Sequence, residues 1–497
     1  MPLLRWLPLA LLTLAAFWLR THDLARRPMH ADEANQAVKL GELLDAGRYA
    51  FDPRDHHGPT LYYAALPVAW LRGESSLASL TEGTVRLVPA LFGTLTVLLV
   101  AALAAPLGRW PALAAAALVA TAPPAVYYSR YFIQETLLVA WVLGAFLAVR
   151  TWWRTGLSRW ALAAGVCAGC AQSTKASAPL FIAAGLLALW VARDGKPLTR
   201  HPGRDVAFTL GAAVLVAALL YSSFGTNLSG LRDALTVYTH AATRFGGEAA
   251  ATGHEKPWWY YLRIFGWHRE GGLLWHQLAW SALAVAGALV AVFRRDAWIR
   301  GAAIYTLLIA TAFSLFAYKT PWHAVHFVPG LAIVAAGALA AIARLRTGRL
   351  VALAFALITV ATLVQQAWRA AFLRPADPRN PYAYVHSSPD VLKYRPLADA
   401  ARQAFPGQPI RVISEEYWPL PWYFRGLKDV GYYIETPMDC DGALLVVSPN
   451  MVEAVRATLK EHYDESILGL RPGVLCIVMQ RERGPAGARE PVANQPR

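Results

Sequence analysis

The sequence has few charged residues. Asp, Glu, Lys and Arg make up 16% of its 497 residues, whereas 56% are hydrophobic. Soluble globular domains carry about 25% charged residues, and so few charges cannot cover the surface of a soluble protein of this length. Four cysteines in the whole chain also exclude a disulfide-stapled scaffold. The composition therefore favours a chain embedded mostly in a membrane, and its 19 tryptophans are typical of rings at membrane–water interfaces.

Acidic residues are scarcer than basic ones. The chain has 32 Asp and Glu against 47 Lys and Arg, a net charge of +15. In a soluble protein this surplus would favour nucleic-acid binding, but in a membrane protein it is typical of short cytoplasmic loops rich in arginine. Because the arginines gather in short connectors between apolar runs, we expect no nucleic-acid partner.

The few cysteines indicate little about chemistry. Cys167 and Cys170 form a CxxC pair inside an apolar run, without a second pair or a nearby histidine, which favours core packing over a metal site. Cys440 and Cys476 lie in the C-terminal segment, where an oxidising compartment would allow them to pair.

Apolar runs near the length needed to cross a bilayer recur along the chain. The first ends in Phe17-Trp18-Leu19-Arg20, without the small-x-small cleavage site of a signal peptide, so we expect an uncleaved anchor. Eleven transmembrane helices are predicted, at residues 3–20, 86–105, 109–128, 133–150, 158–173, 177–193, 206–224, 272–293, 298–317, 323–343 and 349–368.

The positive-inside rule orients these helices. Arginine is concentrated in every second connector, and placing those connectors in the cytoplasm also places the N-terminus there. The long loops 21–85 and 225–271 then face outward, and an odd number of helices puts the C-terminal segment outside as well. We expect a multi-pass protein of the cell inner (cytoplasmic) membrane. The basic connectors lie around Arg109 and at residues 150–159, 193–205, 294–300 and 344–349.

The composition changes from about residue 374, which predicts a helical membrane domain over 1–373 and an α/β domain over 374–482. Helical periodicity marks Val391–Phe405 and Met451–His462. Short β-rich runs mark residues 409–414, 442–448 and 474–480. The end, residues 483–497, has the composition of a disordered tail. The expected fold is an α-helical polytopic membrane protein with a small extracytoplasmic α/β domain.

Two adjacent carboxylates, Asp32 and Glu33, follow the first apolar run. Carboxylates at a membrane boundary are costly unless they are hydrated, paired or catalytic. One interpretation is a solvated helix start, with Asp32 as N-cap and Glu33 near the positive helix end. The other is a catalytic acidic pair.

A second polar segment reads Asp55-His56-His57-Gly58-Pro59. Gly-Pro marks a turn, and the aromatic apolar run after it predicts a helix lying on the membrane. Histidines beside a carboxylate are able to bind a metal, but no second spaced pair supports such a site.

Three cations lie in different predicted outer connectors: Arg130, Lys175 and Lys319. Each alone is an ordinary interfacial anchor. Together with the acidic pair they indicate an anionic lipid substrate, because a phosphate needs charge-assisted donors and a carboxylate can serve as base for an attacking hydroxyl. Glu135 lies deeper in an apolar run, and we expect Arg130 or Lys175 to be its partner.

These residues carry a resemblance that covers nearly the whole chain. An acidic pair after the first span, a polytopic body and an extracytoplasmic C-terminal domain resemble the GT-C superfamily, whose members use polyprenyl-phosphate sugars. The group it resembles most is protein O-mannosyltransferase-like (glycosyltransferase family 39-like), in a subgroup named flippase-activity-associated. The similar segments are His30-Ala31-Asp32-Glu33, His56-His57-Gly58-Pro59-Thr60-Leu61-Tyr62-Tyr63, Tyr128-Ser129-Arg130, Tyr318-Lys319-Thr320-Pro321-Trp322, Tyr384-Val385-His386-Ser387-Ser388-Pro389-Asp390 and Trp418-Pro419-Leu420-Pro421-Trp422-Tyr423.

The resemblance implies transfer of a sugar, with inversion, from a polyprenyl-phosphate donor to an extracytoplasmic glycan, lipid or protein. Asp32 matches the catalytic acidic position and Glu33 would position a substrate. Electrostatics, rather than the resemblance, assigns Arg130, Lys175 and Lys319 to the donor phosphate. No cofactor is expected, and the tail lacks the β-trefoil-like repeat of eukaryotic mannosyltransferases. The remaining candidates for substrate binding are His56, His57, Tyr128, Glu135 and Trp322.

Two alternatives remain at this point. One is a non-catalytic protein that binds lipid-linked sugars or assists their flipping, which needs the cations but not Asp32. The other is a metal-dependent hydrolase built on His56 and His57. In the C-terminal segment, Trp418, Trp422 and Tyr423 suit either carbohydrate contact or packing at a membrane seam.

Overall fold

The computed structural model describes residues 6–54, 57–193, 198–246 and 254–482. The chain forms two compact units. The first consists of Met1–Arg27 and Lys39–Tyr384, and the second of Pro28–Val38 and Val385–Arg497. Helix α2 (Ala31–Ala46) begins in the second unit and continues into the first.

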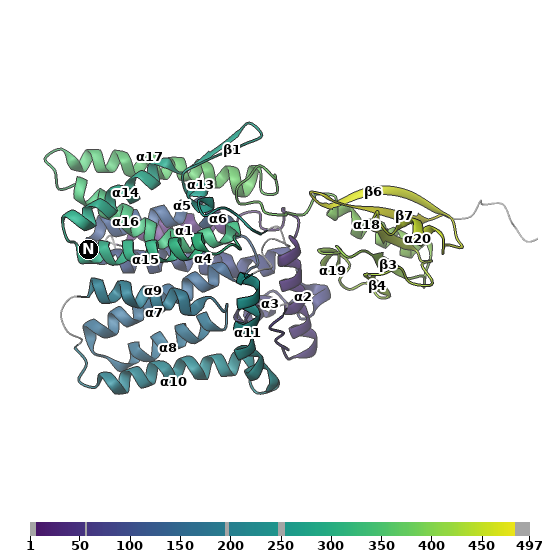
Figure 1. Cartoon of the computed structure of the whole chain (residues 1–497), viewed down its shortest axis with the longest axis horizontal. Helices are drawn as coiled ribbons and strands as arrows, with labels where there is room; N and C mark the ends of the chain where they lie inside the picture. The colour runs from purple at the N-terminus through teal and green to yellow at the C-terminus, as the bar shows by residue number, and fades with distance from the viewer. Residues whose placement is uncertain (1–5, 55–56, 194–197, 247–253, 483–497) are drawn as a thin grey trace, which may run out of the picture. The chain divides into compact units, whose positions relative to one another are not determined.

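The first unit is a bundle of antiparallel helices with one short hairpin (Figure 1). The hairpin consists of β1 (Trp267–Glu270) and β2 (Leu273–His276), which pair antiparallel. The helices are α1 (Leu7–Thr21), α3 (Thr60–Leu71), α4 (Glu82–Ala104), α5 (Arg109–Thr121), α6 (Pro123–Tyr128), α7 (Glu135–Thr155), α8 (Ser158–Gln172), α9 (Ala178–Ala192), α10 (Pro202–Tyr221), α11 (Ser229–Gly246), α13 (Tyr260–Phe265), α14 (Leu278–Phe293), α15 (Ala297–Leu315), the 3-10 helix η4 (Pro321–Phe327), α16 (Val328–Ile342), α17 (Gly348–Trp368) and the π-helical turn η5 (Arg369–Leu373).

Each of the eleven predicted spans contains a helix, but the helices differ in length. Among the described residues, six are long and apolar enough to cross a membrane. The third predicted run, 109–128, is broken because Pro123 and Pro124 follow α5; Pro123 lacks the N–H that would continue the ladder and instead begins α6. Eleven spans therefore stay a prediction. The six long helices are Glu82–Leu107, Glu135–Thr155, Pro202–Tyr221, Ala297–Leu315, Pro321–Ile342 and Gly348–Leu373.

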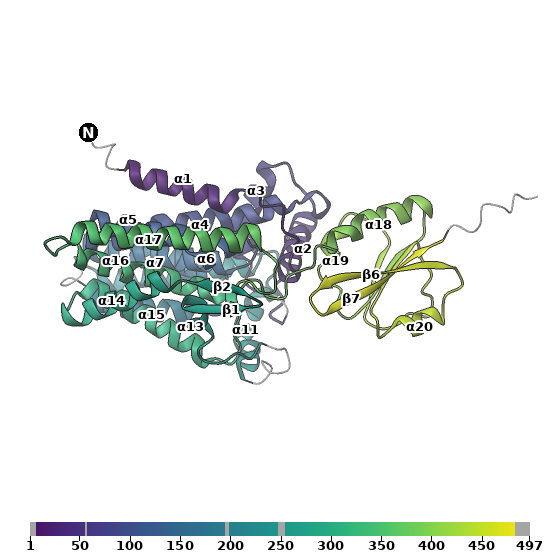
Figure 2. The same ribbon diagram turned by 90° about the horizontal axis from the view of Figure 1, so that it is seen from above.

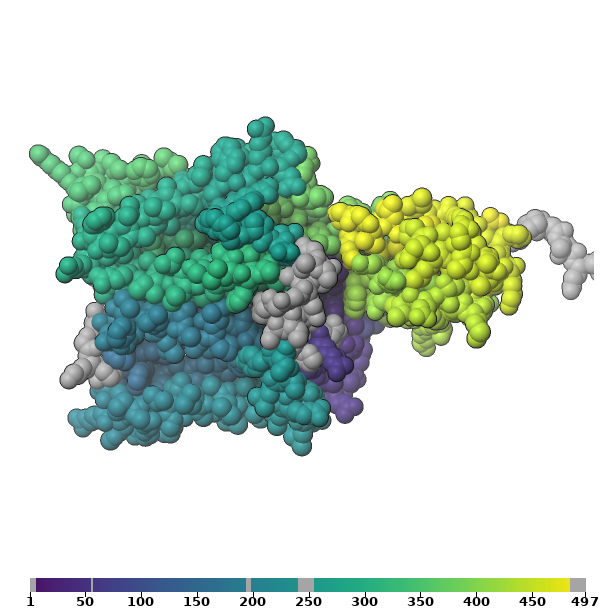
Figure 3. Space-filling model, in the orientation of Figure 1, coloured from purple at the N-terminus to yellow at the C-terminus, as the bar shows by residue number. Residues whose placement is uncertain are grey.

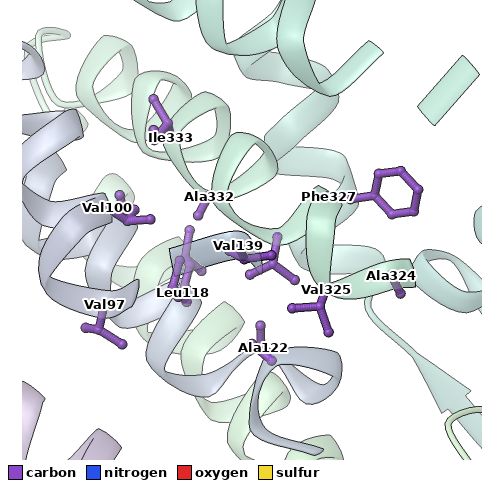
Figure 4. Close-up of a cluster of buried hydrophobic side chains, with 14 of the residues drawn as sticks. Val97, Val100, Leu118, Ala122, Val139, Ala324, Val325, Phe327, Ala332 and Ile333 are labelled. Atoms are coloured by element: carbon purple, nitrogen blue, oxygen red, sulfur yellow. The ribbon is translucent and has the colours of Figure 1, made fainter. Parts of the chain in front are cut away.

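The bundle has a buried centre and an apolar outer surface. Val97 and Val100 of α4, Leu118 of α5 and Val139 of α7 belong to one buried cluster with Ala332 and Ile333 of α16 (Figure 4). Small residues allow close approach elsewhere: a Cβ on Gly165 of α8 would lie 2.2 Å from a carbonyl oxygen of α10. On the outside, α10, α14, α15 and α17 expose leucines and valines, as helices do against lipid. Figure 3 shows α10 and α15 at the surface of the bundle.

The two ends of the first unit differ in charge. Arginines gather at the C-terminal ends of α7 and α9 and in the connectors after α14 and α16, at one end of the bundle, on the left in Figure 1; we call this the arginine-rich end. The opposite end holds the first turns of α7 and α9, where the polar residues predicted to bind substrate are found.

The second unit is a five-stranded sheet covered by helices (Figure 2). The strand order is β4-β3-β5-β7-β6; β3 is parallel to β4 and β5, while β7 is antiparallel to β5 and β6. All four residues of β5 are buried, as expected for a central strand. The elements are α18 (Val391–Ala404), β3 (Ile410–Ile413), α19 (Leu420–Tyr423), β4 (Val430–Tyr433), β5 (Leu444–Val447), α20 (Val452–Arg456), β6 (Tyr463–Arg471) and β7 (Val474–Arg481).

The predictions for the C-terminal segment hold in part. The helix at Val391 and the strands β3, β5 and β7 are confirmed. The predicted helix Met451–His462 is wrong in extent, because only α20 forms, and β4 and β6 were not predicted. The predicted tail 483–497 lies outside the described residues.

The unit boundary also differs from the prediction. It falls at Tyr384/Val385 rather than at residue 374, and Pro28–Val38 joins the second unit. Cys440 and Cys476 are buried and not paired with each other, so the suggested disulfide is absent from the structure.

Candidate functional site

The acidic motif forms a capping box at the start of α2. The N–H of Asp32 donates to Nδ1 of His30 (2.9 Å), and the N–H of His30 donates to Oε2 of Glu33 (3.2 Å). Two otherwise unsatisfied helix N–H groups are thereby satisfied, with histidine in the place usually held by Ser or Thr. His30, and not Asp32, is therefore the N-cap residue.

This arrangement gives the two carboxylates different surroundings. Glu33 is fully buried, and its carboxylate accepts the hydrogen bond from the His30 N–H at the helix start. The side chain of Asp32 is 51% exposed, and its Oδ2 lies 3.9 Å from Nδ1 of His30. Asp32 is thus the carboxylate of the pair that a substrate is able to reach.

Residues far along the chain hold the segment before α2 in place. The N–H of Met29 donates to the hydroxyl of Tyr423 (2.9 Å), and the hydroxyl of Ser387 donates to the carbonyl of Met29 (2.7 Å). The rings of His30 and His386 lie 5.0 Å apart. These contacts explain why Pro28–Val38 belongs to the second unit. They also give the His386-Ser387 and Trp418–Tyr423 segments a role in positioning the acidic motif.

A cation accompanies Asp32. Arg471, at the end of β6, pairs with Glu416. Burial lowers the pKa of Arg471, and the negative charge of Asp32 acts on it in the opposite direction. Arg471 was not predicted from the sequence, because nothing in its local pattern separates it from a surface arginine.

The end of the first unit opposite the arginine-rich end contains a buried ion pair. Glu135, the first residue of α7, pairs with Lys175, which lies in the turn between α8 and α9. Their side chains are 3% and 13% exposed. The predicted partnership of Glu135 with Lys175 is confirmed.

The turn that carries Lys175 is bound to the predicted His-His-Gly-Pro segment. The N–H of Gly58 donates to the carbonyl of Thr174 (3.2 Å), and the N–H of Thr60 donates to the carbonyl of Ser173 (3.0 Å). A Cβ on Gly58 would lie 2.1 Å from the Ser173 carbonyl oxygen, so only glycine allows this approach. The segment thus positions the turn beside Lys175, and α3 follows it as predicted.

Two histidines that the sequence analysis did not single out lie in the same cluster. His323 accepts or donates a hydrogen bond with the hydroxyl of Tyr261 (3.2 Å), and His326 stacks on Phe181 with ring centroids 4.2 Å apart. Both histidines belong to η4, which packs against α7, the helix that carries Glu135. Nε2 of His326 is buried and has no hydrogen-bond partner among the described residues. The sequence did offer one sign of this pair, because His323 and His326 are three residues apart after Pro321 and so lie on the same face of a helix.

Arg130 has a different environment from the one predicted. Its guanidinium donates to the carbonyls of His22 (2.5 Å) and Asp23 (3.1 Å), which follow α1, and lies 4.3 Å from the ring centroid of Phe372. Orphan carbonyls at a helix C-terminus attract cations in this way. The geometry favours a structural role for Arg130, and Arg130 is not the partner of Glu135.

The Lys319 ammonium is also hydrogen-bonded to backbone groups. Its ammonium donates to the carbonyls of Phe316 and Lys256, and the side chain is buried. It joins the segment before α13 to the end of α15. Of the three predicted phosphate ligands, only Lys175 is paired with a side chain of the candidate site.

The remaining predicted residues are placed as follows. The hydroxyl of Tyr128 donates to the carbonyl of Tyr382 (2.7 Å), and the buried Trp322 contacts Tyr384 edge-on with centroids 5.8 Å apart. His56 lies outside the described residues. Within the part of the chain that the structure describes, no three His, Cys, Asp or Glu side chains are grouped to hold a metal. Trp422 and Tyr423 are buried, which favours packing over carbohydrate contact.

Comparisons with known proteins agree with this architecture. The family model described as Dolichyl-phosphate-mannose-protein mannosyltransferase matches residues 62–194. ArnT from Cupriavidus metallidurans bound to undecaprenyl phosphate is 17% identical, with a TM-score of 0.66 over 94% of this chain and 97% of that chain. The apo state of the same protein gives a TM-score of 0.61 at the same identity and coverage.

A second similar structure is the Archaeoglobus fulgidus oligosaccharyltransferase in its apo form, 14% identical, with a TM-score of 0.55 over 93% of this chain and 73% of that chain. No curated protein matches the sequence. The fold of this chain is therefore similar to that of ArnT and of the oligosaccharyltransferase.

Proposed function

We propose that this protein is a membrane glycosyltransferase that moves a hexosyl-type sugar from a polyprenyl-phosphate donor to an extracytoplasmic acceptor. The observation that carries the proposal is the half-exposed carboxylate of Asp32, held at a capped helix start in a chain with the GT-C fold. ArnT, the similar structure above, binds undecaprenyl phosphate, which supports a lipid-linked donor here.

In the proposed reaction Asp32 removes the proton of the acceptor hydroxyl. The hydroxyl oxygen forms a bond to the anomeric carbon as the bond from that carbon to the phosphate oxygen breaks. The electron pair leaves with polyprenyl phosphate, and the configuration of the sugar inverts. Glu33 acts as a positioning residue, because its carboxylate holds the helix start that carries Asp32.

Lys175 is the cation we propose for the donor phosphate. Because Glu135 already neutralises it in the resting protein, binding a phosphate requires the ammonium to share or exchange its partner. We propose no resident cofactor; turnover that survives chelation with EDTA is the expected result.

We further propose that the arginine-rich end of the first unit is cytoplasmic and that the second unit lies outside, in an inner membrane. Arginines at the C-terminal ends of α7 and α9 and in the connectors after α14 and α16 support this orientation. A single cysteine introduced at Arg346, in a cysteine-free background, tests it. Labelling by an impermeant reagent only after the cells are broken is expected; labelling of intact cells would reverse the orientation.

The activity is tested with purified protein in lipid and a panel of radiolabelled polyprenyl-phosphate sugars, comparing wild type with Asp32→Asn. Sugar loss from one donor by the wild type alone would support the transferase and identify the sugar. Equal, saturable donor binding without turnover in both proteins would instead favour a lipid-sugar binding or flippase-assisting protein.

A further inference from the structure

A cavity lined by arginines, tryptophans and apolar side chains lies at the arginine-rich end of the first unit, away from the candidate site. It has a volume of about 230 Å³ and is lined by α7, α9 and the start of α15. Arg150 on its wall is fifteen residues after Glu135 on the same helix, or roughly 23 Å at 1.5 Å per residue. The cavity is therefore separate from the Glu135–Lys175 cluster.

Three arginines converge on this cavity: Arg150, Arg154 and Arg193. Two are held in place by aromatic rings. The guanidinium of Arg150 lies 4.9 Å from the ring centroid of Trp298, and that of Arg193 lies 4.2 Å from the ring centroid of Trp190. Among the described residues, none that lines the cavity is acidic. The cavity thus presents concentrated positive charge that is suited to an anion.

The cavity also offers neutral donors. Trp153 and Trp298 line it, and the indole N–H of each is buried without an acceptor among the described residues. A buried donor that lacks an acceptor is costly. Both indoles belong to the wall of the cavity, and an oxygen-rich ligand that reached their N–H groups would supply the missing acceptors. Leu186 and Leu189 of α9 complete the wall with apolar surface.

Ordinary interfacial anchors do not explain these features together. Isolated Arg and Trp side chains at a membrane boundary extend toward headgroups individually. Here they enclose one volume, combine cations with unsatisfied N–H donors, and adjoin apolar side chains. That combination suits a molecule with a phosphate head and hydrocarbon chains, and basic pockets between transmembrane helices are known to bind such head groups.

We propose that this cavity binds the phosphodiester headgroup of an anionic glycerophospholipid, with the acyl chains lying along α7 and α9. Arg150 and Arg193 supply the charge, and the indole N–H groups of Trp153 and Trp298 donate to phosphate or glycerol oxygens. The lipid holds the ends of α7, α9 and α15 together at the arginine-rich end.

The test measures lipid retention by native mass spectrometry on the full-length protein in detergent, titrated with phosphatidylglycerol or phosphatidylcholine. We expect tighter binding of phosphatidylglycerol. The double variant Arg150→Gln/Arg193→Gln is expected to weaken that binding about 30-fold, from about 1 kcal/mol for each arginine. The matched control, Arg344→Gln/Arg346→Gln, removes two exposed charges at the same end and should leave binding unchanged.

A second variant keeps the test decisive if the double variant folds poorly. Trp153→Phe keeps the ring and removes one N–H, and a loss of about fivefold is expected from one hydrogen bond. Equal affinity for the two lipids, or equal weakening by the control pair, would overturn the proposal. Displacement of phosphatidylglycerol by millimolar inorganic phosphate would also overturn it, because the cavity would then recognise free phosphate rather than a lipid.

Discussion

Asp32 and Glu135 occupy the same local position and have opposite environments. Each lies in the first turn of a helix, where the helix dipole favours negative charge. The Asp32 side chain is 51% exposed, whereas that of Glu135 is 3% exposed and paired with Lys175. A position at a helix start alone therefore does not assign a role to a carboxylate. Burial and pairing make Glu135 an organising residue, and exposure leaves Asp32 available to a substrate.

The largest effect is expected from Asp32→Asn. General base catalysis contributes about 10²- to 10⁴-fold, so sugar transfer should fall by that factor. The side chain keeps its size and the capping box uses only the Asp32 backbone, so thermal stability should stay near that of the wild type. Transfer by the variant at half the wild-type rate or more would show that the exposed carboxylate of Asp32 has no catalytic role that distinguishes it from Glu135.

The next effect concerns the buried pair. Glu135→Gln or Lys175→Met leaves one buried charge without its partner, and each should destabilise the first unit by about 3–5 kcal/mol. The double variant Glu135→Gln/Lys175→Met should be more stable than the sum of the single losses predicts. Thermal unfolding midpoints of the four proteins check this; strictly additive losses would show that the pair is not coupled.

A smaller effect is expected at Glu33. Glu33→Ala removes the side chain that accepts from the His30 N–H and should cost about 0.5–2 kcal/mol, as helix caps do. Glu33→Gln retains an acceptor and should restore most of that loss. Hydrogen exchange of the peptide that spans α2 measures both variants. If Gln exchanges as fast as Ala, the carboxylate acts by charge and not as a cap.

The smallest effect is electrostatic and lies in the second unit. The Lys393 ammonium and the N–H of Gly469 hold the pKa of Asp390 below its usual range. A depressed carboxyl pKa stabilises the fold above about pH 4, and that contribution is lost as the pH falls through the folded value. Because Asp390 is partly exposed, the effect should stay below about 1 kcal/mol. Asp390→Asn should reduce the acid-induced rise in hydrogen exchange around Gly469, and an unchanged rise would rule this contribution out.

Local patterns predicted much of the helical architecture. The apolar runs located a helix in each predicted span. Glu135 lies in an apolar run and needs a cationic partner, and few cations were predicted on the same side of the membrane, so Lys175 could be named as a candidate. The break at Pro123 could have been predicted, because proline lacks the N–H needed for the next helical hydrogen bond. Strand β6 was harder, since its Asp464 and Glu465 hide the alternation expected of a strand.

Long-range contacts were beyond the reach of those patterns. The Asp32 helix start is held by Ser387 and Tyr423, more than 350 residues away in sequence. The acceptors of Arg130 are backbone carbonyls, which every residue type has. The sequence therefore contains no sign that this cation is already hydrogen-bonded. Hydrogen bonds to backbone groups thus decided which predicted cations remained available to a substrate.

The most direct test follows donor binding and transfer together in wild type and Asp32→Asn, in the same vesicles and with the same polyprenyl-phosphate sugar. The proposed role predicts that the variant binds the donor with wild-type affinity and transfers at most about a hundredth as much sugar. Transfer by Asp32→Asn at the wild-type rate would contradict the assignment of Asp32 as the catalytic base.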